Sequence, residues 1–178
     1  MKEDTKITAS LPKGTKDYWG RELALKKKLL IAIEDNFKRY GFSPLQTSQM
    51  ELSSMIGNSL SDDADNPMSD VFTFDEDGEQ ISLRYDLSVP LSRFYSQNYL
   101  TLPNPYKRYQ IAESVFRREK PGSGRYKAFG QCDCDIIGNF NSSIANAELC
   151  NLIASTLLNC GLKKEQFVIN ISNRKIIG

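Results

Sequence analysis

The sequence contains no histidine among its 178 residues, and this absence narrows the chemistry open to the chain. Imidazole is excluded as a general acid, a general base or a metal ligand. The four cysteines do not replace it, because Cys132 and Cys134 are too close together and too strand-like in their setting for a zinc knuckle. We therefore expect reduced, mostly buried thiols and no metal site made of side chains. Any catalysis must use cations, carboxylates, amides and metal.

Long apolar runs and a strong net charge are also missing. No stretch approaches the ~18 apolar residues that cross a bilayer, and the N-terminal MKEDTKITASLPKG lacks the apolar segment of a secretory signal. The net charge of +1 gives no general attraction to DNA or to a membrane, so any RNA contact must be local. With 40% hydrophobic and 25% charged residues, the composition predicts a soluble, cytoplasmic globular domain.

The apolar pattern predicts a mixture of helices and strands. Apolar residues four apart indicate a helix from about residue 20 to 39, which Gly41 ends. Further helices are predicted over residues 88–97, with Ser88 as the N-cap, and over 144–159. Strand-like segments lie at residues 71–74, 80–85, 106–119, 125–138 and 167–171.

This order of elements predicts an α+β fold, a mostly antiparallel β-sheet with helices packed against it. The hairpin over residues 108–138 should be central, because the Cys132, Cys134 and Ile136 face of its second strand is apolar. Residues 1–10 are expected to form a flexible arm, and the polar residues 57–70 a surface loop.

The richest stretch is FRREKPGSGRYKAFGQCDCDIIG, which covers residues 116–138. Because side chains alternate along a strand, Arg117 and Glu119 should share a face before the Pro/Gly loop. Without a bulge, a second face would carry Phe129, Gln131, Asp133 and Asp135. Arginines suit phosphates, because the guanidinium fork binds them in a bidentate way. The aromatic ring can stack on a base, and the glutamate can accept a hydrogen bond from an exocyclic amine.

A second group of polar residues ends the strand predicted over residues 80–85. Asp86 and Ser88 stand where that strand opens a helix, at the rim of a cleft. Together with Gln131 and Asp135, Asp86 suits a small cationic ligand with several N–H donors. Neither Ser88 nor any cysteine has an adjacent base, so no covalent nucleophile is indicated. Catalysis would consist of positioning and electrostatic stabilisation.

Arg117-x-Glu119, followed after the Pro/Gly loop by Arg125 and Phe129, resembles motif 2 of the class II aminoacyl-tRNA synthetases. The run GRYKAFGQCDCD over residues 124–135 resembles histidyl-tRNA synthetases in particular. Residues 83–90, LRYDLSVP, are similar to the family's amino-acid-binding turn, with Ser88 in place of the usual threonine. Residues 40–51, YGFSPLQTSQME, resemble motif 1, which forms the dimer, although Ser48 stands where the family usually has proline. Residues 11–17, LPKGTKD, resemble the entry segment that precedes the first helix.

The resemblance implies a histidine–tRNA ligase, which uses ATP to form histidyl-adenylate and then charges the 3′ end of its tRNA, with Mg²⁺ on the phosphates and a homodimer as the assembly. It implies that Arg117, the catalytic residue, binds the α-phosphate and that Arg125 reaches the γ-phosphate. Glu119 would meet the adenine amine and Phe129 would stack on the ring. The histidine ammonium would lie among Asp86, Ser88 and Gln131, with Asp135 facing the imidazole.

The resemblance covers residues 11–178, the N-terminal part of a catalytic domain, and we expect the chain alone to be inactive. Motif 3, the later histidine-recognition segment and the anticodon-binding domain are absent from it. One alternative is the synthetase-like regulatory subunit of histidine biosynthesis, which does not charge tRNA; the presence of the four ATP residues favours the enzyme. Another is an unrelated α+β domain with a charged hairpin.

Overall fold

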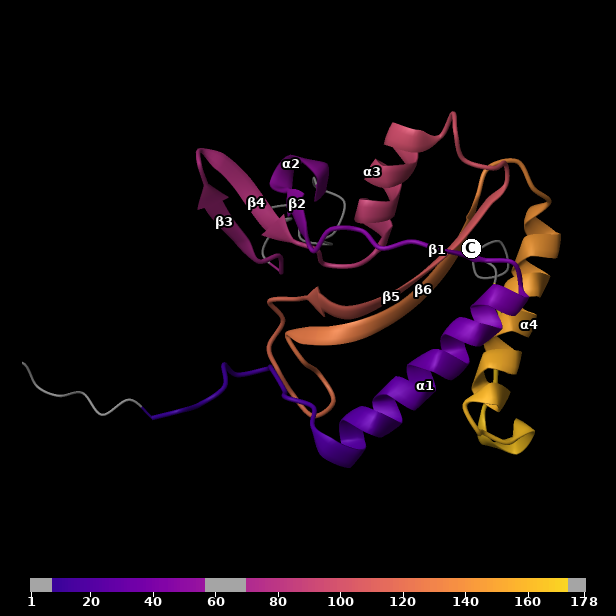
Figure 1. The fold of residues 1–178 in the computed structure, drawn as a ribbon, viewed down its shortest axis with the longest axis horizontal. Helices are drawn as coiled ribbons and strands as arrows, with labels where there is room; N and C mark the ends of the chain where they lie inside the picture. The colour runs from indigo at the N-terminus through magenta and orange to yellow at the C-terminus, as the bar shows by residue number, and fades with distance from the viewer. Residues whose placement is uncertain (1–7, 57–69, 173–178) are drawn as a thin grey trace, which may run out of the picture. The chain divides into compact units, whose positions relative to one another are not determined.

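The computed structural model describes residues 8–56 and 70–172. Most of the expected N-terminal arm and all but one residue of the expected loop at 57–70 lie outside these ranges. Contacts divide the chain into two compact units. The first unit comprises residues 1–18, 47–97 and 112–131, and the second comprises 19–46, 98–111 and 132–178. The long strands β5 (Tyr106–Phe116) and β6 (Ala128–Ile137) are neighbours in one sheet (Figure 1). Each strand contributes residues to both units.

The second unit contains two long helices, α1 (Gly20–Arg39) and α4 (Ser142–Asn159). Its strand β1 (Ser43–Pro44) pairs in parallel with β5, and the order in this sheet is β1-β5-β6. The buried centre of the unit is formed by four residues, which come from α1, the segment after it, β5 and α4: Phe37, Phe42, Tyr109 and Leu152.

Both helices follow the expectation from periodicity, and their ends have identifiable causes. Helix α1 covers the predicted residues, and Gly41 beyond its last turn has φ 77°, a left-handed conformation that glycine adopts at little cost. Helix α4 begins after Asn141, whose side-chain oxygen accepts the N–H groups of Ser143 and Ile144. This cap satisfies two donors that a helix start leaves unpaired.

A buried amide joins the two helices. Asn36 on α1 is 2% exposed, and its Nδ2 donates to the Leu152 carbonyl and to the hydroxyls of Ser155 and Thr156. Its Oδ1 accepts a hydrogen bond from Asn159 Nδ2 at 2.9 Å. Because the donors and the acceptor of this side chain are all used, the amide fixes the register of α1 against α4.

The first unit is built on a small antiparallel sheet. Its order is β2 (Met50–Leu52), β4 (Glu79–Leu83) and β3 (Thr73–Glu76), with helix α2 (Ser53–Ile56) directly after β2 and helix α3 (Ser88–Asn98) after β4. A tight turn over Asp77 and Gly78 joins β3 to β4. The predicted hairpin is therefore present, with its turn where the Asp-Gly signal stands.

A buried arginine ties this sheet to the long hairpin. Arg84 is 3% exposed, its Nε and Nη2 donate to the Ser114 carbonyl, and its Nη1 donates to the Thr47 carbonyl. In return, the Arg84 carbonyl accepts the N–H of Phe116 at 3.0 Å. Arg84 therefore holds the end of β4 beside the end of β5, where the residues of interest begin.

The α+β architecture is confirmed, but three local predictions are wrong. Residues 167–172 form no strand; they follow the short 3₁₀ helix Lys164–Gln166 as irregular chain. Cys132 is exposed instead of buried, and β6 lies at the edge of the described sheet, with β5 in the middle. Ser88 does not cap α3, because the side chain of Asp86 accepts the N–H groups of Ser88 and Val89.

Within residues 8–56 and 70–172, the helices lack the combination of length and apolar character that spanning a membrane requires.

Candidate functional site

Arg117 follows β5 directly and is held from several sides. Its N–H donates to the Lys127 carbonyl at 2.9 Å, across the hairpin. Its guanidinium carbon lies 4.4 Å from the ring centroid of Tyr85 and 5.2 Å from that of Phe129. Its Nε donates to the Tyr85 carbonyl at 3.4 Å. Two aromatic faces therefore orient the cation, an arrangement that the flat guanidinium group favours.

Tyr85 stands at the centre of a cluster of charges. The pKa of its phenol is raised, first by burial and then by the carboxylates of Glu119, Asp70 and Asp86, while Arg117 lowers it. The Arg117 Nη1 also lies 3.8 Å from Glu119 Oε1. In the sequence, alternation along the predicted strand places Tyr85 with Ile81 and Leu83 on the apolar face, so its role beside Arg117 was not predicted. The sequence feature that could have identified Tyr85 as a site residue is its place immediately before Asp86, at the end of the predicted strand.

Phe129 and Arg125 have different surroundings. The half-buried Phe129 ring packs against Leu87, Ala112 and Val115, so its position is set by the core of the first unit. Arg125 lies in the turn of the hairpin, where it forms an isolated antiparallel bridge with Gly122, and its side chain is exposed. Within the described residues, no ion pair or ring contact joins Arg125 to the Arg117, Glu119 and Phe129 group.

The predicted turn at Asp86 and Ser88 is present, but the side chain that accepts hydrogen bonds at the start of α3 is that of Asp86 and not that of Ser88. Oδ1 of Asp86 accepts the N–H of Ser88 at 3.0 Å and that of Val89 at 3.4 Å, so the carboxylate has a fixed orientation at the start of α3. Ser88 is exposed and lines a cavity of about 410 Å³. The other residues that line it come from α2 and α3: Met55, Ile56, Val89, Ser92, Arg93 and Ser96.

Gln131 presents an acceptor that the described residues do not use. Its side-chain Oε1 is buried, yet it accepts no hydrogen bond from any residue within 8–56 and 70–172. Most buried polar atoms in folded proteins do have a partner, and an exception calls for an explanation. A ligand that brings an N–H group would supply one.

Asp135 belongs to the second unit, on the same strand as Gln131 but four residues further along. Its Oδ2 contacts the guanidinium of the fully buried Arg108, which also bonds Asp133 at 3.1 Å. The meeting of Asp86, Gln131 and Asp135 in one pocket stays a prediction.

The entry segment contacts the site through its backbone. The Gly14 carbonyl accepts the N–H of Lys127 at 2.7 Å, and the Lys127 carbonyl accepts the N–H of Arg117. A Cβ at Gly14 would lie 2.8 Å from Lys127 Cγ, and Gly14 has φ 85°, so this position favours glycine for two reasons. A ladder of backbone bonds therefore runs from Gly14 to Arg117.

The segment that resembles motif 1 has its own buried ion pair. Both oxygens of Glu51 accept from Arg93 of α3, at 2.6 and 2.8 Å, and the Glu51 side chain is 3% exposed. The Ser48 hydroxyl accepts the N–H of Met50 at 3.1 Å. In this way the serine at the usual proline position fixes the turn that leads into β2.

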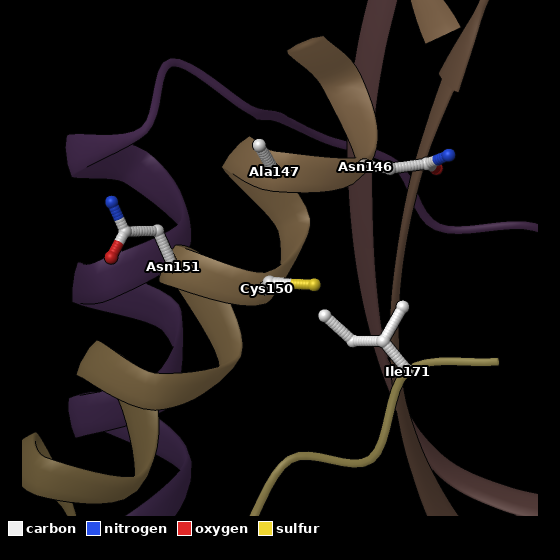
Figure 2. A pocket seen from close by; sticks show the side chains of 5 residues that line it. All are labelled: Asn146, Ala147, Cys150, Asn151 and Ile171. Atoms are coloured by element: carbon white, nitrogen blue, oxygen red, sulfur yellow. The ribbon is translucent and has the colours of Figure 1, made fainter. Parts of the chain in front are cut away.

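A second cavity, of about 470 Å³, lies beside α4 in the second unit. Figure 2 shows the Cys150 sulfur directed toward Ile171, with Ala147 on the neighbouring turn. The two remaining lining residues are Asn146 and Asn151, so among residues 8–56 and 70–172 no cation or carboxylate lines the cavity. This cavity therefore lacks the charged groups that acid–base or phosphate chemistry needs.

In the described part of the chain, no group of three or more cysteine, aspartate or glutamate residues is arranged to hold a metal ion. The ionisable groups near Arg117 are instead suited to an organic ligand with phosphates.

Sequence comparisons with known proteins agree on one family. A sequence profile described as histidyl-tRNA synthetase matches residues 14–178. A curated histidine–tRNA ligase from Pelagibacter ubique is 58% identical over 99% of this chain, and one from Cereibacter sphaeroides is 41% identical over 95% of it. The chain spans 38% and 34% of the lengths of these two relatives.

Solved structures support the same conclusion. The histidyl-tRNA synthetase from Nostoc sp. PCC 7120 aligns with a TM-score of 0.71 and 26% identity, over 85% of this chain and 34% of that one. A protein from Bacillus halodurans, described as an ATP phosphoribosyltransferase regulatory subunit/histidyl-tRNA synthetase, has a TM-score of 0.74 at 20% identity, over 87% of this chain and 39% of that one, which establishes the fold alone. The matched profile, the identity to curated relatives and the shared fold together establish that the chain belongs to the histidyl-tRNA synthetase family.

Proposed function

We propose that this chain is the N-terminal part of the catalytic domain of a cytoplasmic histidine–tRNA ligase. The observation that carries the proposal is the buried, unused Oε1 of Gln131, on the strand that also contains Asp135. The ammonium group of an amino acid has three N–H donors and would give this oxygen a charge-assisted hydrogen bond. Asp86, whose carboxylate is already oriented at the start of α3, adds a compensating negative charge.

The second half of the proposal concerns ATP. The oriented guanidinium of Arg117 suits the α-phosphate, where negative charge develops as the histidine carboxylate attacks phosphorus and pyrophosphate leaves. Glu119 would accept a hydrogen bond from the adenine amine, Phe129 would stack on the base, and the exposed Arg125 would reach the γ-phosphate. The histidyl group would then pass from the adenylate to the terminal ribose of the tRNA, which releases AMP.

Magnesium would be carried on the phosphates of the nucleotide, where it would neutralise the charge of the leaving pyrophosphate. Among the described residues, no group of three or more cysteine, aspartate or glutamate side chains could hold a metal ion. This chain's own residues would contribute to the orientation of both substrates.

The proposal is tested in the full-length protein by histidine-dependent exchange between ATP and pyrophosphate. Gln131→Met should raise the KM for histidine by about tenfold or more, because a hydrogen bond to a charged group is lost. The KM for ATP should stay within about twofold, an estimate that assumes an unchanged nucleotide site. Absence of exchange with the unmodified protein would refute the ligase.

The same substitution separates a ligand contact from a structural one. Replacing an unsatisfied buried acceptor by an apolar group of similar size is neutral or stabilising for the fold. The melting temperature of Gln131→Met without ligand should therefore equal or exceed that of the unmodified protein. A lower melting temperature together with the raised KM would assign Gln131 to the core.

The alternative is a regulatory subunit of histidine biosynthesis that has the fold and does not charge tRNA. The Bacillus halodurans protein, whose description contains both names, keeps this alternative open. The presence of Arg117, Glu119, Arg125 and Phe129 favours the ligase, since a regulator needs no ATP site. An anticodon-binding domain in the downstream sequence and charging of tRNA would decide between them.

A further inference from the structure

Arg108 is the most deeply buried charged residue of the second unit. It lies on β5 with no exposed side-chain surface, opposite Ser43 of the neighbouring strand β1. Removing a cation from water costs several kcal/mol unless counter-charges compensate it. Here the compensation comes from Asp133 and Asp135, both of which contact Nη2 of the arginine.

A buried arginine with a purely architectural task has a different environment in the same protein. Arg84 donates through three nitrogens to the backbone carbonyls of Thr47 and Ser114, and so joins segments of the fold. Arg108 instead bonds carboxylates, and its Nε and Nη1 are buried without a hydrogen-bond partner among residues 8–56 and 70–172. A group that served only to hold the fold together would be expected to have these donors satisfied.

The two carboxylates differ from the arginine in exposure. Asp133 and Asp135 are two residues apart on β6 and so point to the same side of the strand. Their side chains are 25% and 40% exposed, whereas that of Arg108 is 0% exposed. The cluster thus places the cation on the inside and the carboxylates toward solvent, where a ligand can reach them.

We infer that Arg108 is a positioning residue for substrate recognition, which holds the Asp135 carboxylate in the orientation that receives the imidazole of histidine. This inference rests on the proposed function, in which Asp135 faces that ring. Contact of Oδ2 with a rigid, buried guanidinium fixes the rotation of the carboxylate, which an exposed aspartate would otherwise sample freely. Asp133 holds the same guanidinium nitrogen and so keeps Arg108 in place.

The net charge of the cluster of Arg108, Asp133 and Asp135 also suits the imidazole of histidine. One cation between two carboxylates leaves a net charge of −1, which attracts a ring N–H and suits an imidazole or imidazolium. Without the cation, two adjacent carboxylates would disfavour each other's ionised form, and the pKa of one would rise. Arg108 therefore sets both the direction and the charge of the recognising group.

The test uses the full-length protein and ATP–pyrophosphate exchange, with Arg108→Met, Arg108→Lys and the control Lys107→Met. Lys107 is the adjacent cation, but it pairs with Glu148 and with the Tyr40 carbonyl. We expect the KM for histidine to rise at least about tenfold in Arg108→Met, less in Arg108→Lys, and to stay unchanged in the control. The KM for ATP should be unchanged in all three.

Measurement of the histidine KM at several pH values distinguishes the positioning role of Arg108 from a purely structural one, because a structural role would not change the pH dependence. In Arg108→Met the histidine KM, relative to that of the unmodified protein, should rise as the pH is lowered below about 7, because loss of the cation raises the pKa of one carboxylate of the pair and its protonation begins at a higher pH. Arg108→Lys retains the cation and should show no such trend. Two other titratable groups lie in this field, Tyr106 and Cys134. Burial raises the pKa of both, that of Cys134 to about 11, so neither titrates in this range.

The outcomes of these experiments separate the proposed ligase function from the positioning role of Arg108. If the unmodified protein gives no histidine-dependent exchange, the proposed function fails. If it is active and Arg108→Lys leaves the histidine KM unchanged, the positioning role is overturned, even where Arg108→Met fails to fold. Equal rises in the KM values for histidine and ATP would likewise overturn it and assign Arg108 to general stability.

Discussion

Arg117 has its position before any ligand arrives. Its backbone is bonded to Lys127, and its guanidinium lies against the rings of Tyr85 and Phe129. A preorganised donor costs no reorganisation when charge develops in a transition state, which is the condition for strong electrostatic catalysis.

Arg117→Ala should therefore reduce ATP–pyrophosphate exchange in the full-length protein by about 10²–10³-fold, which corresponds to ~2.7–4 kcal/mol of transition-state stabilisation. Lys127→Ala is the control, because the Lys127 backbone groups that hold Arg117 remain. The comparison is made as kcat/KM for ATP. Equal losses in the two variants would remove Arg117 from the reaction.

At the residue scale, the sequence predicts which residues share one face of a strand. It does not predict which residues contact one another in the folded chain. Alternation along β6 is a local property, so Asp133 and Asp135 could be assigned to one face. Whether Cys132 is buried depends on what covers an edge strand, and local sequence does not contain that. Asp86 and Ser88 are both good caps by residue type, and only the path of the backbone decides in favour of Asp86.

The amide of Asn36 joins the two long helices of the second unit, in addition to their apolar contacts. Asn36→Ala removes the hydrogen bonds that join α1 to Leu152, Ser155, Thr156 and Asn159, and it takes away the acceptor of the Asn159 amide. The free energy of unfolding should fall by about 2–3 kcal/mol. Denaturant unfolding followed by circular dichroism measures it, with exposed Asp35→Ala as the control. A loss below about 0.5 kcal/mol, the usual range for surface changes, would contradict the role.

At the element scale, helices with a strong apolar stripe and a terminal glycine were predicted within a residue or two. The strand predicted over residues 167–171 was wrong, because a short alternating run becomes a strand only where a partner strand supplies hydrogen bonds. The parallel pairing of Ser43 with Arg108 joins positions far apart in the chain, and no local pattern indicated it.

At the scale of the whole molecule, the feature that bears on assembly is β2, a strand that lies at an edge of the described sheet. Its burial alternates, with Glu51 inside and Met50 and Leu52 exposed at 55% and 41%. Exposed apolar residues on an open edge are typical of a surface that another chain covers. In the homodimer that the resemblance to motif 1 implies, we expect this strand to form the contact between the two copies.

Leu52→Glu should therefore weaken the dimer of the full-length protein at least about tenfold in its dissociation constant, because it would bury a charge in an apolar contact. Phe74→Glu is the matched control, since Phe74 is 40% exposed and lies on β3, the opposite edge. Sedimentation velocity over a dilution series measures both. Equal dissociation of the two variants would exclude β2 as the contact.

The backbone ladder from Gly14 through Lys127 to Arg117 has a consequence for how the protein is made. Gly14 leaves the ribosome early, but its hydrogen-bond partner is translated roughly 110 residues later. At about 5–20 residues per second, Gly14 waits on the order of ten seconds for Lys127. During translation the entry segment therefore has no native partner, and the position of Arg117 is completed only when the first and later parts of the chain meet.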